Sequence, residues 1–304
     1  LATLVRELEI VLADGTITRC SPSVQPQLFE AARLGIGAIG IITEVTLACV
    51  RAFTLRAVEA PGSLDETLES LEHDRTATDH FEFYWFPHTR RVLTKHNTRL
   101  PGDTPVDRIH PVRGFIDDEL LSNVAFGGLN LLGTAFPQAI PTINTFSSQV
   151  LSAREYTEHS YRVFASPRRV RFREMEYAIP VETLADVLVE VDRWIAASGT
   201  HIAFPIEVRF AAADDVWLST AHGRDSAYVA VHQFHRRDHR AYFDAVEAIA
   251  RAVDGRPHWG KLHSRTYADL QPTYSRLDDF KQVRDTYDPA RMFNNPYLQQ
   301  VLGS

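Results

Sequence analysis

Two amphipathic helical segments, each flanked by β-strand patterns, most strongly constrain how this 304-residue chain can fold. Residues 181–197 and 239–253 have the length and apolar spacing of helices that bury one face. Strand-like runs and a last helix surround them, in the order 171–179, 202–210, 227–234, 258–262 and 275–287. Such an arrangement places helices on one face of a sheet. We therefore predict an α+β fold in which an antiparallel sheet is covered by helices.

The first 55 residues show a different pattern and form a separate predicted unit. Two strands, a helix and a third strand are expected at Val5–Ala13, Thr16–Cys20, Pro26–Leu34 and 41–50. Asp14-Gly15 is the turn signal of a hairpin, and Gly35 is a typical helix stop. Leu1 leads directly into the first strand with no initiator Met, so we expect a fragment of a longer protein. Residues 56–304 form the second predicted domain.

The middle of the chain is predicted as mixed structure. We expect a short helix at 64–71, strands at 81–86 and 91–95, a loop at 97–113 and helices within 117–151. In the aromatic run FEFYWF, Phe81, Phe83 and Trp85 share one strand face and are predicted core residues. A sugar-pocket role for Tyr84 or Trp85 is the less favoured alternative.

Composition excludes several classes of protein. Hydrophobic residues make up 44% and charged residues 23% of the chain, as in ordinary globular domains, so global disorder is excluded. The net charge is −7 and there is no sustained Lys/Arg run, so no nucleic acid is expected as a partner.

The cysteines and the apolar runs indicate where in the cell the protein is expected. Cys20 and Cys49 make neither a disulfide framework nor a zinc spacing, and both are predicted to be buried in a reducing, cytoplasmic compartment. No apolar run reaches the ~20 residues that a membrane span needs. The apolar region starting at Asn123 is broken by glycines and prolines, which favours a packed helix pair, with membrane-surface association as the open alternative.

A glycine cluster, Gly35-Ile36-Gly37-Ala38-Ile39-Gly40, is the first candidate site. Glycines allow backbone amides to approach a ligand closely. The cluster lies between a helix and a strand, the reverse of the strand–turn–helix order of the dinucleotide fingerprint, so a nicotinamide site is rejected. A tight turn without a ligand remains open on the residues alone.

The strand PIEVRF, residues 205–210, is the second candidate site. Glu207 and Arg209 are two residues apart and share one face, while Ile206, Val208 and Phe210 form the other. An acid and a guanidinium on one face can orient a polyhydroxylated ligand and stabilise negative charge on oxygen. A solvent-facing ion pair is the alternative on the strand pattern alone.

The block RPHWGKLH, residues 256–263, is the third candidate site. Lys261 follows Gly260 and could reach a closely packed ligand. His258 and His263 are candidate substrate-binding residues, although single histidines more often have structural partners. Their spacing offers no third ligand, so no metal is predicted.

The N-terminal passage ADGTITRCSPSVQPQLFEAARLGIGAIGIITEVTL resembles the end of the flavin-binding domain in the vanillyl-alcohol-oxidase superfamily. The resemblance covers about residues 5–50. It implies that the backbone of this stretch runs along FAD, with the lining residues Gly37, Ala38, Gly40, Ile41 and Ile42.

The Glu-x-Arg strand, the His-Trp-Gly-Lys block and the tail YDPARMFNNPYLQQVL, in this order, resemble the substrate domain of the aldonolactone oxidase family. That family includes gulonolactone oxidases and dehydrogenases, arabinonolactone oxidases and alditol oxidases. The resemblance implies that Glu207, Arg209 and Lys261 are catalytic and that His232 faces the same pocket. Asn295, beside Asn294, falls on the segment that returns toward the flavin.

The resemblance implies flavin-dependent oxidation of a sugar-derived 1,4-lactone of the D-arabinono or L-gulono type, with hydride transfer to FAD. The electron acceptor would be oxygen or another carrier. The family's FAD phosphate-binding segments would precede Leu1. The alternatives are an alditol oxidase that acts on open-chain polyols and a non-catalytic fragment that binds sugar or assists assembly.

Overall fold

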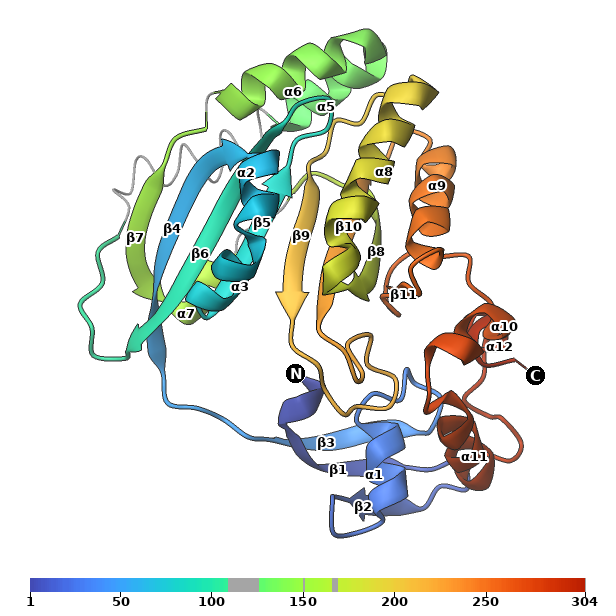
Figure 1. Cartoon of the computed structure of the whole chain (residues 1–304). Helices are drawn as coiled ribbons and strands as arrows, with labels where there is room; N and C mark the ends of the chain where they lie inside the picture. Colours follow the sequence, from blue (N-terminus) through green and yellow to red (C-terminus); the bar gives the residue numbers. More distant parts are fainter. Residues whose placement is uncertain (109–125, 150, 166–168, 304) are drawn as a thin grey trace. The chain divides into compact units, whose positions relative to one another are not determined.

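The structure is a computed structural model that describes residues 1–108, 126–149, 151–165 and 169–303 (Figure 1). The chain divides into two compact units, each of which gathers segments from distant parts of the sequence. Unit 1 contains Leu1–Val50, Ala211–Ser226 and Asp254–Ser304, and unit 2 contains Arg51–Phe210 and Ala227–Val253.

Unit 2 is built on an antiparallel sheet with the strand order β8-β10-β9-β5-β6-β4-β7. The strands are β4 (Phe53–Ser63), β5 (His80–Trp85), β6 (Arg91–Pro101), β7 (Arg154–His159), β8 (Phe172–Pro180), β9 (Ile206–Ala211) and β10 (Ser226–Phe234). The helices of this unit are α2 (Leu64–Glu69), α3 (Leu71–Ala77), α5 (Phe126–Ala135), α6 (Ile140–Gln149), α7 (Ser160–Phe164), α8 (Leu184–Ser198) and α9 (Arg240–Arg251). The α+β class and the helix-covered antiparallel sheet are confirmed.

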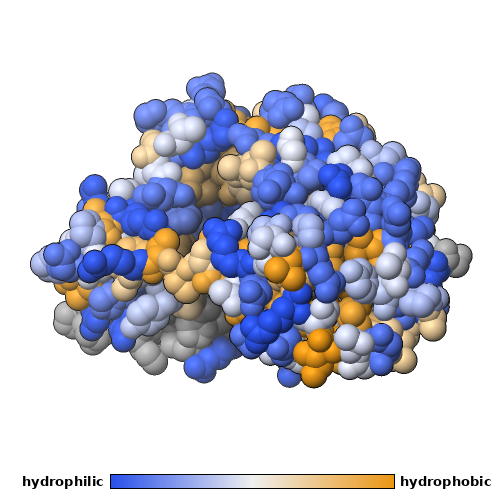
Figure 2. All heavy atoms as spheres, turned by 90° about the horizontal axis from the view of Figure 1, so that it is seen from below, coloured by the Kyte–Doolittle hydropathy of each residue, from blue (hydrophilic) through white to orange (hydrophobic). Residues whose placement is uncertain are grey.

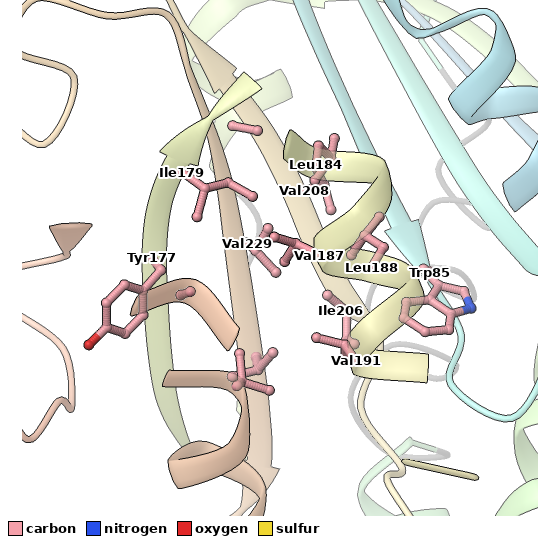
Figure 3. Packing of buried hydrophobic residues seen from close by; sticks show 14 of the residues in the cluster. Trp85, Tyr177, Ile179, Leu184, Val187, Leu188, Val191, Ile206, Val208 and Val229 are labelled. Atoms are coloured by element: carbon pink, nitrogen blue, oxygen red, sulfur yellow. The ribbon is translucent and has the colours of Figure 1, made fainter. Parts of the chain in front are cut away.

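One face of the sheet packs against α8 and α9 to form the core of unit 2 (Figures 1 and 3). Helix α8 presents Leu184, Val187, Leu188, Val191 and Ile195, at three- and four-residue spacing, and ends at Gly199, which adopts a left-handed φ of 66°. The strands contribute Phe81, Phe83, Trp85, Ile206, Val208 and Val229, among others. Each fully buried side chain of this size contributes about 1.5–3 kcal/mol to folding. The predicted core faces of 81–86 and 205–210 are therefore confirmed.

Unit 1 contains a small sheet of order β2-β1-β3 and helices from both ends of the chain. Its elements are β1 (Val5–Val11), β2 (Ile17–Cys20), β3 (Ile41–Leu47), α1 (Pro26–Ala32), β11 (Arg256–Pro257), α10 (Tyr267–Leu270), α11 (Leu277–Tyr287) and α12 (Pro296–Leu302). The core joins Leu28 and Phe29 of α1 to Phe280 of α11 and Val301 of α12. The hairpin predicted around Asp14-Gly15 is confirmed, because β1 and β2 pair antiparallel.

Four sequence-based expectations need correction. Residues 258–262 form a turn instead of a strand, closed by a 3.1 Å hydrogen bond from the Lys261 N–H to the His258 carbonyl. Strand β6 continues to Pro101, so 97–101 is not a loop, whereas 109–113 lies outside the described residues. Cys20 is buried but Cys49 is exposed.

The fourth correction is that the structure contains strands β4 and β7, which the sequence patterns did not predict. Pro61-Gly62 in β4 resembles a turn signal, but the pairing of β4 with β7 stops at Glu59, so Pro61 lies where β4 has a partner on one side only. Proline is tolerated on such an edge. Of the predicted helical region 117–151, residues 117–125 and 150 lie outside the described residues, and α5 and α6 account for most of the rest.

Candidate active site

The face of the unit 2 sheet opposite α8 and α9 carries a row of charged and polar side chains. Because side chains alternate along a strand, the residues between the core positions point to this second face. The row contains Arg154 (β7), Glu59 (β4), Lys95 (β6), Glu82 and Tyr84 (β5), Glu207 and Arg209 (β9), Glu174 and Glu176 (β8) and His232 (β10). At the β4 end, Val163 of α7 packs over Leu55 and Ala57 and covers part of the face.

Glu207 and Arg209 form the centre of this row, as their spacing predicts. The Arg209 Nε lies 3.3 Å from Glu207 Oε1, and Arg209 Nη2 donates a 3.1 Å hydrogen bond to Glu176 Oε2. The two carboxylates are almost fully buried, whereas the Arg209 side chain is 42% exposed. Burial disfavours the cation, but Glu207, Glu176 and Glu82 outweigh it and raise the pKa of Arg209. The guanidinium is thus held charged while part of it remains accessible.

Tyr84 joins this pair to a further carboxylate. Its hydroxyl lies 3.3 Å from Glu207 Oε1 and 3.3 Å from Glu82 Oε1. The pairing of β5 with β9 sets this contact, since Glu82 is opposite Arg209 and Tyr84 is opposite Glu207. Burial raises the pKa of Glu82, and Lys95 opposes that shift.

The row continues toward the sheet edge as alternating charges. Lys95 Nζ lies 3.6 Å from Glu82 Oε1 and 3.9 Å from Glu59 Oε1. Arg154 Nε donates a 2.6 Å hydrogen bond to Glu59 Oε2. A polar network of this kind fixes the orientation of its members, because each charge has an opposite charge next to it.

His232 lies on the same face and is buried. Its Nε2 is 3.2 Å from Glu174 Oε1, and its ring meets Phe172 edge to face at 5.0 Å between centroids. These contacts fix the ring beside the Glu207–Arg209 strand, because β10 is the neighbour of β9. Its assignment to substrate binding stays a prediction.

The other predicted site residues lie in unit 1. Lys261 is half-buried in the turn that follows β11. His258 is exposed, and its Nδ1 accepts a 3.1 Å hydrogen bond from the Gly260 N–H. The His263 Nε2 is 2.9 Å from the Tyr297 hydroxyl. Both histidines therefore have structural partners, and the substrate roles of all three residues stay predictions.

The glycine cluster leaves backbone and apolar surface accessible beside β3. Gly37 has a φ of +80° with open space where a Cβ would point, and Ile41 and Ile42 are 58% and 44% exposed. Every residue of β3 is exposed, and Figure 2, a view from below Figure 1, shows hydrophobic patches among the polar surface of that side. That FAD lies along this strand stays a prediction.

Three predicted cofactor contacts have structural roles of their own. Ala38 is buried, and its N–H donates a 2.8 Å hydrogen bond to the Gly35 carbonyl. A Cβ on Gly40 would lie 2.5 Å from the Val11 carbonyl oxygen, so this glycine permits close packing. Asn295 caps α12, because its Oδ1 accepts a 2.9 Å hydrogen bond from the Leu298 N–H. Their cofactor roles are predictions that these contacts do not address.

Sequence reasoning missed Glu82, Glu174 and Glu176. The signal was present in two strands: FREMEYAIP places two acids, and FEFYWF one acid, between residues that face the core. Recognising that Glu82 and Glu176 lie beside Arg209, and that Glu174 lies beside His232, required the strand order, which the sequence did not provide.

Among the described residues, no group of His, Cys, Asp and Glu could hold a metal ion. Within the same part of the chain, no helix is both long enough and apolar enough to cross a membrane.

Comparisons with known proteins agree with this architecture. The model of the D-arabinono-1,4-lactone oxidase family matches residues 45–301. L-gulono-1,4-lactone dehydrogenase of Mycobacterium tuberculosis is 40% identical over 306 residues, which cover 100% of this chain and 69% of that protein. L-gulonolactone oxidase of Bos taurus is 32% identical, over 99% of this chain and 69% of that protein. Cholesterol oxidase of B. sterolicum shares the fold, with a TM-score of 0.72 at 16% identity, over 99% of this chain and 69% of that one.

Proposed function

Because this chain belongs to the D-arabinono-1,4-lactone oxidase family, we propose that the protein oxidises a sugar-derived 1,4-lactone of the D-arabinono or L-gulono type with bound FAD. The observation that carries the proposal is the Glu207–Arg209–Glu176 cluster, which holds a partly accessible cation between buried carboxylates. Such a cation is suited to stabilising an oxygen anion, because its carboxylate neighbours fix its position before the substrate binds.

The chain's residues position the substrate and stabilise its developing charge. Glu207 accepts a hydrogen bond from a substrate hydroxyl and orients Arg209. Arg209 stabilises the alkoxide that develops as the carbinol loses its proton. Lys261 is proposed as a further catalytic residue on the family resemblance. His232, on β10, is proposed to bind the substrate. The flavin, when bound, accepts the hydride from the carbinol carbon, and Gly37, Ile41 and Ile42 support its ring.

Anaerobic reduction of the flavin tests this proposal. The holoenzyme, produced from its full reading frame, is mixed with L-gulono-1,4-lactone or D-arabinono-1,4-lactone, and the loss of oxidised-flavin absorbance is followed. Arg209→Ala and Lys261→Ala should each slow reduction by about 10²–10³-fold, as the loss of a preorganised charge at a developing oxyanion does. Arg56→Ala and Lys281→Ala are the matched controls. Reduction at the wild-type rate in either site variant would contradict the assigned roles.

Two alternatives are separated by the same assay. A polyol oxidase would reduce its flavin faster with xylitol than with either lactone. A non-catalytic chain would show no flavin absorbance after purification with FAD.

Oxygen consumption during turnover, compared with reduction of an artificial acceptor, distinguishes oxygen from another carrier as the electron acceptor.

We also propose that the α5–α6 region associates with a membrane surface. Residues 126–149 contain no Asp, Glu, Lys or Arg, and Leu131, Leu132, Phe136 and Phe146 are 48%, 45%, 61% and 62% exposed. Exposed apolar side chains on an uncharged helix pair favour burial at a lipid interface. Cosedimentation with phospholipid vesicles should fall in Leu131→Ser/Phe136→Ser but not in Val189→Ser, an equally exposed valine on α8. Equal binding by all variants would contradict this.

A further inference from the structure

The Tyr84 hydroxyl lies between two carboxyl groups that come from different strands. It is 3.3 Å from Oε1 of Glu82, on its own strand β5, and 3.3 Å from Oε1 of Glu207, on the neighbouring strand β9. A tyrosine hydroxyl has a single proton to donate, although it can also accept. It can therefore donate a well-directed hydrogen bond to one of these carboxylates at a time.

The second contact is favourable when the other carboxyl carries a proton. A protonated carboxyl donates to the tyrosine oxygen, and the tyrosine donates onward to the ionised carboxylate. The three groups then form a continuous chain of hydrogen bonds. This chain holds one proton more than it would with both carboxyls ionised and the phenol neutral. The direction of the chain reverses if each proton shifts by one position.

The groups that face this chain set where the extra proton resides. Lys95 of β6 lies 3.6 Å from Glu82 and is shared with Glu59 of β4. Arg209 contacts Glu207 and is shared with the buried Glu176 of β8. Burial is the largest influence on Glu82 and raises its pKa, Glu207 acts in the same direction, and Lys95, Arg209 and the Tyr84 hydrogen bond oppose it. Glu82 is therefore the carboxyl suited to holding a proton.

Exposure also differs between the two ends of the chain. The Glu207 side chain is 7% exposed, whereas the Glu82 side chain is 21% exposed. A proton on Glu207 has no short route to water through its own surface, while a proton on Glu82 can reach solvent more readily.

We propose that Glu207, Tyr84 and Glu82 form a relay that carries the proton of the substrate hydroxyl away from the reacting centre. The relay rests on the proposed function, because the oxidation supplies the proton. The substrate O–H bond breaks and the proton moves to the Glu207 carboxylate, while the C–H bond breaks and its hydride goes to the flavin. The Glu207 proton then passes to the Tyr84 oxygen as the Tyr84 proton passes to Glu82. No electrons move along the relay.

Carboxyl carbon NMR tests the shared proton without any turnover. The full chain is labelled at the glutamate side-chain carboxyl carbon and titrated with acid and base. The Glu82 resonance, identified by its loss in Glu82→Gln, should titrate above the ordinary glutamate value of ~4.3 and should shift in Tyr84→Phe. Glu155→Gln, on the exposed Arg56–Glu155 pair, should leave it unchanged. Titration of Glu82 at or below the ordinary value, or no response to Tyr84→Phe, would overturn the relay.

Steady-state kinetics of the holoenzyme test its use in the reaction. Tyr84→Phe and Glu82→Gln should each lower kcat by roughly tenfold, with KM for the lactone within about twofold, because proton removal slows while binding persists. Members of one relay act as a unit, so the double variant should be no slower than the slower single variant. Losses that multiply, or unchanged turnover in Glu82→Gln, would overturn the relay.

The two proposals fail in different ways. A wild-type holoenzyme that reduces its flavin with a lactone, alongside equally fast Tyr84→Phe and Glu82→Gln variants, would refute the relay and leave the function intact. A wild-type holoenzyme that reduces its flavin with neither lactone nor polyol would refute the function and with it the relay. Glu155→Gln and Tyr161→Phe, both at exposed positions, serve as controls in either assay.

Discussion

Removal of the Arg209 charge should destabilise unit 2, because two buried carboxylates share this cation. In Arg209→Met the side chain keeps its length and loses its charge, so Glu207 and Glu176, whose side chains are 7% and 3% exposed, lose the cation that both contact. Breaking a fully buried pair costs about 3–5 kcal/mol, and breaking an exposed pair costs about 0–1 kcal/mol. The Arg209 side chain is 42% exposed, which places this cluster between the two cases. We expect a loss of about 2 kcal/mol in the free energy of unfolding at neutral pH.

Urea denaturation of the parent chain and its variants measures this loss. Arg56→Met is the matched control, since Arg56 and Glu155 form an ion pair in which the two side chains are 53% and 56% exposed. That control should change the unfolding free energy by less than about 1 kcal/mol. Arg209→Lys retains the charge and should fall between the two. An Arg209→Met chain as stable as Arg56→Met would refute the inference that the buried carboxylates depend on this cation.

Two further predictions concern pH and close packing. Burial, with a smaller contribution from His201, lowers the pKa of His88 to about 4, below the ~6.5 of an unfolded chain. The neutral His88 ring therefore contributes fully to stability above pH ~6.5, and this contribution is lost as the pH falls toward the pKa of the folded state. Between neutral pH and pH 5, the free energy of unfolding of the wild type should fall by about 1 kcal/mol more than that of His88→Asn, after allowance for the partial exposure of the ring. Equal losses in urea titrations at the two pH values would show that His88 is not the acid-sensitive group. Gly40→Ala places a Cβ 2.5 Å from the Val11 carbonyl and 2.9 Å from Ile10 Cγ1, and should cost about 1–3 kcal/mol. Thermal unfolding measures this loss. Gly128→Ala, with open space at its Cβ, is the control and should be neutral or stabilising. A neutral Gly40→Ala would show that β1 can move away.

The sequence predicts the site strand well because alternation is a local property. Ile206 and Val208 face the core, and Glu207 and Arg209 lie on the other face, as the period of two requires. In the same way, apolar spacing locates α8 and α9 to within a few residues. These features depend on neighbours in the sequence.

The rest of the site depends on partners that lie far away in the sequence. Tyr84 and Glu207 meet through the β5–β9 register, and Glu176 reaches Arg209 from β8. Strand β7, REYTEH, has little apolar signal because its acidic and basic side chains pair with residues such as Arg56 and Glu59 of β4. The turn at Lys261 was mistaken for a strand because His258 and Trp259 resemble strand residues, while the hydrogen bonds that close the turn are invisible in the sequence.

The central claim is that Glu207 and Arg209, which contact each other on β9, act together on the substrate oxygen, and a double-mutant cycle on flavin reduction tests it most directly. The anaerobic reduction rate with L-gulono-1,4-lactone is measured for the wild-type holoenzyme, Glu207→Gln, Arg209→Ala and the double variant. Groups that contact each other and act on the same substrate oxygen are strongly coupled, so the combined loss should differ from the sum of the single losses by more than about 1 kcal/mol. Losses that add to within about 0.5 kcal/mol, as for independent sites, would contradict the account.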